Sequence, residues 1–364
     1  MKVLFAGFKY EYGVKQWGIS NIEYTNFFGS LKNMENVQAS FFPVDEIIAE
    51  VGRDEMNRRL IKTAEDGKPD LLFTMIFQEE IKKETVEYIT KKTATKTFNW
   101  FADDHWRLPV YSRFWAPLYT AVGTTDSKAP EKYRRLGINN VIKTQWAANV
   151  FLYKPQSNVK GPSSAEATVG KQLSNVHNIT FVGKNYGTRE KYIGGLQRCG
   201  LAARGYGKGW DGGMVDFQAM LEIFSSSKIN LNFTESYFSW PKQLVKLFVK
   251  KSGVGYIPNI QSPISNLQSL IGARRRQIKA RTFEIPACGG FLLTGDADNL
   301  REYYDDGKEI VIFKNKEELE EKCKYYLAHE EERKAIAQAG YQRTLKEHTY
   351  ELRFREIFKK MELM

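Results

Sequence analysis

The sequence has no long apolar run. No uninterrupted apolar segment approaches the roughly 20 residues that a helix needs to cross a bilayer. The apolar start MKVLFAG is followed closely by Lys9 and is too short for the core of a signal peptide, so it predicts a first β-strand. We therefore expect a cytoplasmic protein.

Cysteine is scarce. The three cysteines, Cys199, Cys288 and Cys323, lie far apart, are odd in number and match no metal-ligand spacing. They argue against a disulfide framework and a zinc site, and they fit a reducing compartment. We expect no metal site from the cysteines.

Acidic residues are almost absent from one stretch of the chain. The net charge is +11, and the segment from Lys228 to Arg281 holds ten basic residues but a single acid, Glu235. The surplus charge is therefore local. A local basic segment indicates an anionic partner, such as phosphate, a lipid headgroup or nucleic acid.

Short apolar runs alternate with amphipathic segments along most of the chain. Apolar runs predict strands at 2–7, 69–77, 95–104, 119–125, 139–148, 178–183, 201–209, 228–236, 291–294 and 309–315. Amphipathic segments predict helices at 45–66, 78–92, 189–200 and 283–288 and in a helical tail after 315. This alternation is typical of parallel sheets covered by helices on both faces.

The alternation is interrupted once, by a polar stretch rich in small residues. We expect an N-terminal domain over 1–154, a linker over 155–177 and a second domain over 178–345. The last segment, 346–364, is expected to be a helix that returns to the first domain.

Three strand ends of the second predicted domain carry groups that suit an anionic ligand. Ligands of parallel α/β sheets bind beyond the carboxyl ends of the strands, close to helix N-termini. Lys279 and Arg281 are candidates to neutralise a diphosphate, and Glu284 to accept hydrogen bonds from a ribose. Ordinary βα turns, and a solvated basic face for 274–276, are the alternative interpretations. The full candidate set is Gly183, Tyr186, Arg189, Thr234, Lys279, Arg281, Glu284, Gly289 and Gly290.

The segment RTFEIPACGGFLLT, residues 281–294, joins a helix-like half to a strand-like half at Gly289 and Gly290. Glycine tolerates backbone angles that other residues avoid, so the pair fits a helix end followed by a turn. The alternative is a ligand-facing edge that includes both glycines, with Arg281 as an anion clamp.

The first predicted domain carries two candidate features at its strand ends. Asp103, Asp104 and His105 follow the strand at 95–104 and are candidates for a catalytic base. A helix N-cap, a surface ion pair and a divalent-ion site are the other interpretations of the aspartates. The loop GFKYEYGVKQWG suits either a wall that stacks on a sugar or a plain surface loop; its candidate residues are Gly7, Tyr10 and Gly13.

Several of these segments resemble a known family. KARTFEIPACGGFLLT, REYYDDGKEIVIF, KEELEEKCKYYL and ERKAIAQAGYQRTLKEHTY are similar to the C-terminal donor domain of GT-B glycosyltransferases, most of all the spore-maturation-type bacterial group. WFADDHW and WAANVFLYKP resemble the end of that group's N-terminal domain. The resemblance covers most of 95–350 and is loose in 1–94. It implies an α/β fold of the GT-B type, with two Rossmann-like domains whose parallel sheets face each other across a cleft.

The resemblance also implies an activity. We expect a metal-independent hexosyltransferase that moves a sugar from a nucleotide-diphosphate sugar to a hydroxyl acceptor in cell-surface glycan or glycoconjugate synthesis, without a further cofactor. Many GT-B enzymes carry a Glu-x7-Glu pattern; Glu284 matches its second position, but Arg276 replaces the first acid. The alternatives are a glycosyltransferase that acts on nucleic acid or protein, and a catalytically inactive nucleotide-sugar-binding protein.

The stretch 237–276 is longer than the resemblance explains. Apolar residues at helical spacing and lysines four apart suggest two faces of one helix: Leu244, Leu247 and Phe248 on one, Lys242, Lys246 and Lys250 on the other, with Trp240 before them. Such a helix is typical of an interfacial membrane element; a helix packed on its own domain is the alternative. We therefore expect a glycan or lipid-linked acceptor and an anionic membrane surface as partners in preference to nucleic acid, and a peripheral place at the inner face of the membrane.

Overall fold

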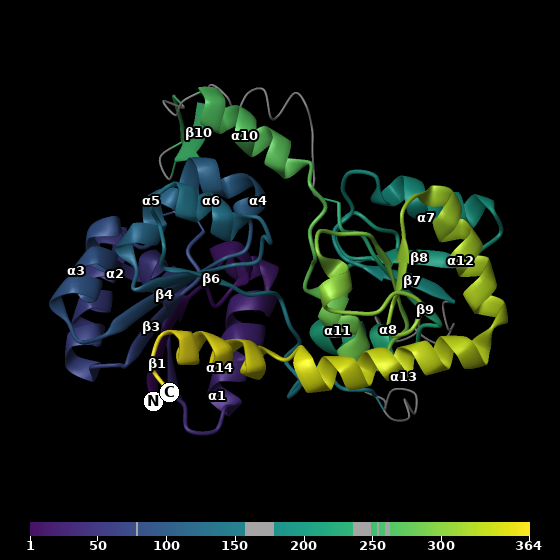
Figure 1. Cartoon of the computed structure of the whole chain (residues 1–364), viewed down its shortest axis with the longest axis horizontal. Helices are drawn as coiled ribbons and strands as arrows, with labels where there is room; N and C mark the ends of the chain where they lie inside the picture. Colours follow the sequence, from purple (N-terminus) through teal and green to yellow (C-terminus); the bar gives the residue numbers. More distant parts are fainter. Residues whose placement is uncertain (78, 157–177, 236–248, 253–254, 259–262) are drawn as a thin grey trace. The chain divides into compact units, whose positions relative to one another are not determined.

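The computed structural model describes residues 1–77, 79–156, 178–235, 249–252, 255–258 and 263–364 (Figure 1). The chain forms two compact units. Unit 1 comprises Met1–Gln145, Trp240–Ala273 and Tyr350–Met364, and unit 2 comprises Trp146–Ser239 and Arg274–Thr349. The chain thus enters unit 2 at Trp146, before the boundary expected at 154. Most of the expected linker, 155–177, lies outside the described residues.

Unit 1 is built on a six-stranded parallel sheet in the order β2-β1-β3-β4-β5-β6. Its strands are β1 (Lys2–Gly7), β2 (Gln38–Pro43), β3 (Leu71–Thr74), β4 (Lys96–Phe101), β5 (Ala121–Thr124) and β6 (Val141–Lys143). The inner strands are apolar on both faces, because helices cover both sides of a parallel sheet. Five of the six strands fall in the expected apolar runs; β2 lies outside them.

The helices of unit 1 come from three separate parts of the chain: α1 (Gly29–Asn33), α2 (Val44–Gly67), α3 (Lys83–Lys92), α4 (Asp104–Arg107), α5 (Arg113–Trp115), α6 (Ala129–Arg135), α10 (Pro263–Ala273) and α14 (Tyr350–Lys360). Aromatic packing holds α14 in this unit. The ring of Phe354 lies 5.6 Å from that of Phe27 and 5.4 Å from that of Phe73. The last helix therefore completes the core of unit 1.

Helix α10 packs closely on α4. A Cβ atom on Gly272 would lie 1.8 Å from the carbonyl oxygen of His105, so only glycine allows this approach. Trp240, Lys242, Lys246 and Phe248 lie outside the described residues. Lys250 lies in β10 (Val249–Ser252), which pairs antiparallel with β11 (Gly255–Pro258). The prediction of a basic helix was therefore wrong at Lys250, which lies in a strand.

Unit 2 is built on a five-stranded parallel sheet in the order β13-β12-β9-β7-β8. Its strands are β7 (Ile179–Val182), β8 (Ala203–Tyr206), β9 (Ile229–Asn232), β12 (Leu292–Gly295) and β13 (Val311–Phe313). Its helices are α7 (Arg189–Arg198), α8 (Phe217–Ser226), α11 (Arg281–Ala287), α12 (Lys316–Ala328) and α13 (Glu330–Glu347). The two parallel sheets confirm the expected α/β fold class.

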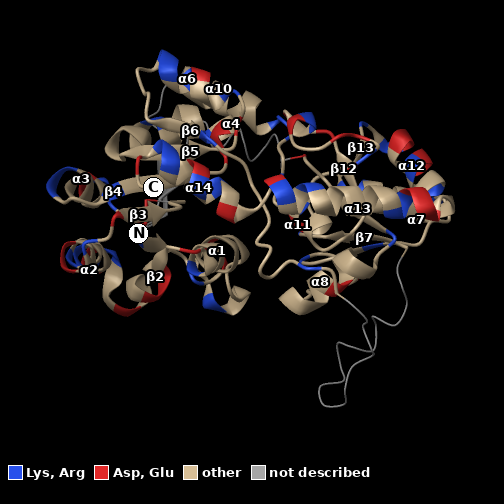
Figure 2. Ribbon diagram, turned by 60° about the horizontal axis from the view of Figure 1, so that its bottom comes forward, with Lys and Arg blue, Asp and Glu red and all other residues tan. Residues whose placement is uncertain are grey.

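Helix α12 carries charges of both signs on its outer face (Figure 2). Lys322 pairs with Glu318 at 2.6 Å and Lys324 with Glu320 at 2.7 Å, each one helical turn apart. Such pairs contribute only about 0.3–0.5 kcal/mol each. The helix is held mainly by its buried face, which includes Leu319 and Cys323.

Glycine is needed at both positions after α11, for a different structural reason at each. Gly289 has a φ of +72°, the left-handed conformation that commonly ends a helix. Gly290 has no room for a side chain: a Cβ atom would lie 2.4 Å from the carbonyl oxygen of Phe224 and 2.8 Å from Nδ2 of Asn230. The pair therefore turns the chain from α11 into β12 against a packed core.

A substitution at Gly290 tests this packing. We expect Gly290→Ala to lower the free energy of unfolding by about 1–3 kcal/mol, because overpacking forces the backbone to shift. Gly194→Ala in α7 is the matched control in the same unit; the nearest atom to its Cβ is Nη1 of Arg198 at 3.4 Å. The control should gain about 0.5–1 kcal/mol of helix stability. Equal urea midpoints for both variants would contradict the expectation.

Candidate functional site

The carboxyl ends of the strands of unit 2 meet at one edge of its sheet. The loops after β7, β9 and β12 all begin there, since the strands are parallel. Ligands of parallel α/β sheets bind at this edge. The described residues that follow these strands include Gly183, Thr234 and Asp296.

Arg189 begins α7 and turns back over the loop that precedes it. Its Nη1 donates to the carbonyl oxygen of Lys184 at 2.8 Å, and its Nη2 donates to the hydroxyl of Tyr186 at 2.8 Å. The guanidinium carbon lies 3.8 Å from the centre of the Tyr186 ring. The side chain is 8% exposed, and its Nε is buried without a hydrogen-bond partner. Burial lowers the pKa of Arg189, while Tyr186 and Glu235 oppose this change, so a desolvated cation stands at the helix N-terminus.

Gly183 fixes the loop between β7 and α7 to the loop after β8. Its carbonyl oxygen accepts a hydrogen bond of 2.8 Å from Nε1 of Trp210. Gly207, with a φ of +115°, approaches so closely that a Cβ atom there would lie 2.7 Å from the same oxygen. The two loops therefore form one rigid rim that places Arg189.

Glu235 contacts several polar groups at the same edge. Thr188 donates to its carboxylate through a short hydrogen bond, and Nη2 of Arg276 donates at 3.2 Å. The hydroxyl of Tyr192 lies 3.5 Å from it. The sequence marks Glu235 as the carboxylate of the strand-end segment NFTES and as the lone acid in a basic stretch, and these were the available signals for its structural role. Arg276, which replaces the expected first acid, is therefore held by Glu235 at the strand ends.

Glu284 is fully buried and both of its oxygens are bonded. Oε1 accepts a hydrogen bond of 3.0 Å from the hydroxyl of Tyr153, and Oε2 forms a short ion pair with Arg281. Burial alone would lower the pKa of Arg281, but Glu284 and Tyr153 raise it above its ordinary value, so the pair is ionic. A ribose can reach Glu284 only if Arg281 moves away. The ribose role stays a prediction.

The other predicted residues of unit 2 have mainly structural contacts. Thr234 is buried, and its hydroxyl donates to the carbonyl oxygen of Asp296 at 2.7 Å, which joins the ends of β9 and β12. Lys279 lies half-buried just before α11. Gly289 and Gly290 form the turn described above. The structure thus brings Tyr186 and Arg189 together at the edge and places the Arg281–Glu284 pair inside α11.

The three candidates for a base in unit 1 differ in exposure. Asp104 is fully buried, and its Oδ2 accepts a hydrogen bond of 3.0 Å from the hydroxyl of Tyr133. Burial raises the pKa of Asp104 to about 6, although nearby hydroxyls oppose this change. His105 is buried as well, whereas Asp103 lines a small cavity with Phe77 and Arg107. Asp103 is therefore the best placed of the three to meet a ligand.

The loop after β1 is tied to α2. The backbone N–H of Tyr10 donates to Oδ2 of Asp45 at 2.9 Å, and its hydroxyl donates to Glu46 at 3.2 Å. Gly7 ends β1 against the ring of Phe5, which lies 2.7 Å from the position of a Cβ atom. Gly13 takes a φ of +71°. These three residues shape the loop.

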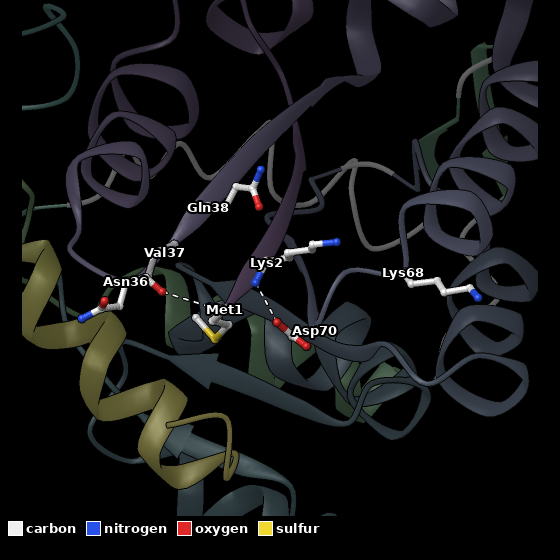
Figure 3. Close-up of a pocket in the computed structure, with 7 residues that line it drawn as sticks. All are labelled: Met1, Lys2, Asn36, Val37, Gln38, Lys68 and Asp70. Atoms are coloured by element: carbon white, nitrogen blue, oxygen red, sulfur yellow. Dashed lines mark hydrogen bonds between the residues drawn. The ribbon is translucent and has the colours of Figure 1, made fainter.

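A hollow at the opposite edge of this sheet is a poor candidate for the site. It is lined by Met1, Lys2, Asn36, Val37, Gln38, Lys68 and Asp70 (Figure 3). The backbone N–H of Lys2 donates to Asp70 at 2.7 Å, and the amino group of Met1 donates to Asn36 at 3.0 Å. These residues stand at the amino ends of the strands, away from the edge where ligands of such sheets bind.

Comparisons with known proteins agree with this architecture. Residues 189–359 match the family model described as glycosyl transferase-like. The spore protein CgeB of Bacillus subtilis is 22% identical over 238 residues, which cover 64% of this chain and only 65% of CgeB.

Solved structures show the same fold. Anabaena HepE in complex with UDP and glucose has a TM-score of 0.56 at 10% identity, with 100% of each chain covered. A glycosyltransferase from Rickettsia africae has a TM-score of 0.59 at 8% identity, with 99% of this chain and 97% of that chain covered. At these identities the similarity shows the fold alone. The chain has the GT-B fold, as expected, and its resemblance to glycosyltransferases is confirmed.

The buried carboxyl of Asp104 predicts a pH-dependent stability. Its pKa in the folded protein, about 6, exceeds the ordinary 3.8, so the folded state keeps the proton where the unfolded chain has lost it. The contribution of Asp104 to the free energy of unfolding therefore falls progressively as pH rises from about 4 to about 6, by about 3 kcal/mol in total.

Urea unfolding from about pH 4 to 7 measures this effect. Asp104→Asn should lose the pH-dependent term, so its stability relative to wild type rises with pH. Tyr133→Phe is the comparison variant: it keeps the carboxyl but removes a hydroxyl that lowers the pKa of Asp104, so the pH dependence should persist and become steeper. Parallel profiles for wild type and Asp104→Asn would rule out the effect.

Proposed function

We propose that this chain, which has the GT-B fold and is glycosyl transferase-like over residues 189–359, moves a hexose from a nucleotide-diphosphate sugar to a hydroxyl acceptor. The observation that carries the proposal is the buried Arg189 at the N-terminus of α7, above the loop that follows β7. HepE, which shares the fold, was solved with UDP and glucose. We infer a donor of the same class for this chain.

The donor diphosphate binds at the carboxyl edge of the sheet of unit 2. The N-terminal N–H groups of α7 and the guanidinium of Arg189 offer positive charge to it. Arg276 adds a second cation at the same edge, held by Glu235. These groups stabilise the negative charge that develops on the leaving diphosphate without a resident metal or cofactor. Glu284 contacts the ribose once its pair with Arg281 opens.

The acceptor binds to unit 1, at the carboxyl edge of that sheet. Asp103, one of the three candidates for a base predicted from the sequence, lines a small hollow there, between the loops after β3 and β4. Its neighbour in the cavity is Arg107, whose Nη2 donates to the carbonyl oxygen of Phe77 at 2.6 Å. We infer an acceptor that is a glycan or a lipid-linked glycan of a cell-surface pathway.

Helix α10 supports a membrane-bound acceptor. Ile264, Leu267 and Ile271 share one face and are 70%, 56% and 61% exposed, whereas the polar residues Ser265 and Asn266 are buried. Leu270 and Ala273 of the same helix are buried, so α10 has apolar residues on both faces and exposes three large aliphatic side chains to solvent. None of the described helices is long and apolar enough to cross a membrane.

Charge favours an anionic lipid surface as the partner of this face. The part of unit 1 from Trp240 to Ala273 has four lysines and no acid. An apolar face combined with basic residues is typical of proteins that bind at the surface of anionic membranes. We therefore keep the peripheral membrane location as part of the proposal.

Donor binding is tested by calorimetry with UDP, GDP, ADP, CMP and dTDP. We expect one nucleotide to bind and Arg189→Ala to weaken it about 10- to 100-fold, since a hydrogen bond to a charged group contributes about 1.5–3 kcal/mol. Arg198→Ala, an exposed residue at the other end of α7, is the control and should bind like wild type. A Tm measurement confirms that the variants are folded. If Arg189→Ala binds like the control, or if nothing binds to wild type, the donor site is not where we propose.

Membrane binding is tested by sedimentation with vesicles of phosphatidylglycerol and phosphatidylcholine. The triple change Ile264→Ser, Leu267→Ser and Ile271→Ser should reduce binding at least about tenfold, because each buried aliphatic side chain contributes about 1.5–3 kcal/mol. Leu352→Ser, at an exposed position of α14, is the matched control. Wild-type protein that stays in the supernatant would contradict the membrane partner.

A further inference from the structure

Exposed aromatic rings cluster at the carboxyl edge of the sheet of unit 1. Tyr12 and Trp17 are 61% and 54% exposed, although both are large aromatic residues. The Tyr12 ring lies 5.8 Å from that of Trp17 and 5.9 Å from that of Phe77. The first two follow β1 and the third follows β3, the neighbouring parallel strand. Two sequence-distant loops therefore form one aromatic surface.

Both loops hold a non-glycine residue in a strained backbone conformation. Tyr12 has a φ of +53° and Glu79 a φ of +64°. Such left-handed residues persist only where the surroundings impose them, and they cluster at ligand sites. The strain at Tyr12 fixes the direction of a ring that contributes little to the core, so its placement serves something other than packing.

Charged groups of both signs flank the aromatic surface. Glu80 accepts a short hydrogen bond from the backbone N–H of Phe77, and the guanidinium of Arg107 lies 5.2 Å from the centre of the Phe77 ring. Glu46 pairs with Lys9 at 3.0 Å. Carboxylates accept hydrogen bonds from hydroxyl groups, and aromatic faces pack on apolar C–H groups. A neutral sugar ring offers both kinds of group.

Glu23 reaches the end of β1 from the helical turn η3 (Asn21–Phe28). Its Oε1 accepts a hydrogen bond of 3.2 Å from the backbone N–H of Phe8. Oε1 also lies 3.2 Å from the position that a Cβ atom on Gly7 would occupy, so the carboxylate stands directly beside the end of β1. Burial raises the pKa of Glu23 well above its ordinary value; the backbone N–H of Phe8 opposes this, and the carboxylates of Glu80, Asp45 and Glu11 add to it.

We infer that the loops after β1 and β3 form the subsite for a sugar ring of the acceptor, where Tyr12, Trp17 and Phe77 pack on the ring and Glu23 is the base for its reacting hydroxyl. This inference rests on the proposed transfer reaction. Glu23 takes the hydroxyl proton, and the hydroxyl oxygen bonds to the anomeric carbon of the donor. The bond from that carbon to the diphosphate oxygen breaks, and the diphosphate leaves with the electron pair. Glu23 replaces Asp103 as the base, and the product anomer is inverted.

Sugar binding is tested without any donor, by saturation-transfer NMR with methyl glucoside, galactoside, mannoside and N-acetylglucosaminide at millimolar concentration. We expect saturation of the ring protons of at least one glycoside by wild-type protein. Trp17→Ala and Tyr12→Ala should each weaken that binding about tenfold, the loss of one stacked ring. Tyr88→Ala is the matched control, because Tyr88 is 40% exposed in the same unit and its hydroxyl donates to Glu65 of α2.

Two results overturn the subsite: no glycoside binds to wild type, or the Tyr12 and Trp17 variants bind like Tyr88→Ala. The outcome is independent of the donor site, because UDP binding is measured separately by calorimetry. Glycoside binding without nucleotide binding would remove the proposed transfer reaction and leave a carbohydrate subsite.

The role of Glu23 is tested with the glycoside that binds, by nucleotide release from UDP-glucose, UDP-galactose and GDP-mannose. Glu23→Gln keeps the shape but cannot take a proton, so kcat should fall about 10²- to 10⁴-fold while KM for the glycoside changes little. Glu65→Gln, an exposed carboxyl in α2, is the matched control and should retain most of kcat. An unchanged kcat in Glu23→Gln, a retained product anomer, or no release by wild type overturns the assignment of Glu23.

Discussion

The constraint on which both units depend is that a parallel sheet buries both of its faces. Polar groups cannot lie along such strands without an internal partner, so they collect where the strands end. Thr74 shows the rule inside the sheet, since its hydroxyl is satisfied by Asn99 at 2.9 Å. At the carboxyl edges polar groups no longer need an internal partner, so Arg189 and Glu235 can present charge to a ligand. The location of both candidate sites follows from this.

Much of the fold was predictable because buried strands are apolar and flanked by turns, as at 2–7 and 178–183. The strand β2 was missed because it lies at the sheet edge and is largely half-exposed, which removes the apolar signal. The candidate site was less predictable. Glu284 is recognisable as an acid before a Gly-Gly turn, but its partner Tyr153 is 131 residues away in the sequence. Only the folded chain shows that the carboxylate of Glu284 already forms an ion pair with Arg281.

In the folded chain, two arginines of the basic stretch form ion pairs with acids of unit 2. A solvated face was the expected alternative for 274–276, yet Arg275 pairs with Asp298 at 2.7 Å and Arg276 with Glu235 at 3.2 Å. Each acid that receives these arginines lies in another loop of unit 2, so no local charge count reveals the pairing. These cations anchor loops at the strand ends. The lysines between Trp240 and Ala273 have no acid near them in sequence, and the proposed attraction to an anionic surface rests on them.

The two carboxyl edges carry different buried groups, and the proposed reaction uses that difference. A leaving diphosphate needs cations that are fixed before the bond breaks, and the buried guanidinium of Arg189 is fixed by Tyr186 and by the Lys184 carbonyl. A sugar hydroxyl instead needs a proton acceptor, and burial together with neighbouring carboxylates raises the pKa of Glu23, which makes it a stronger base. In the proposed reaction the acceptor hydroxyl therefore meets a buried carboxyl at the end of β1, whereas the leaving diphosphate meets a fixed guanidinium at the end of β7.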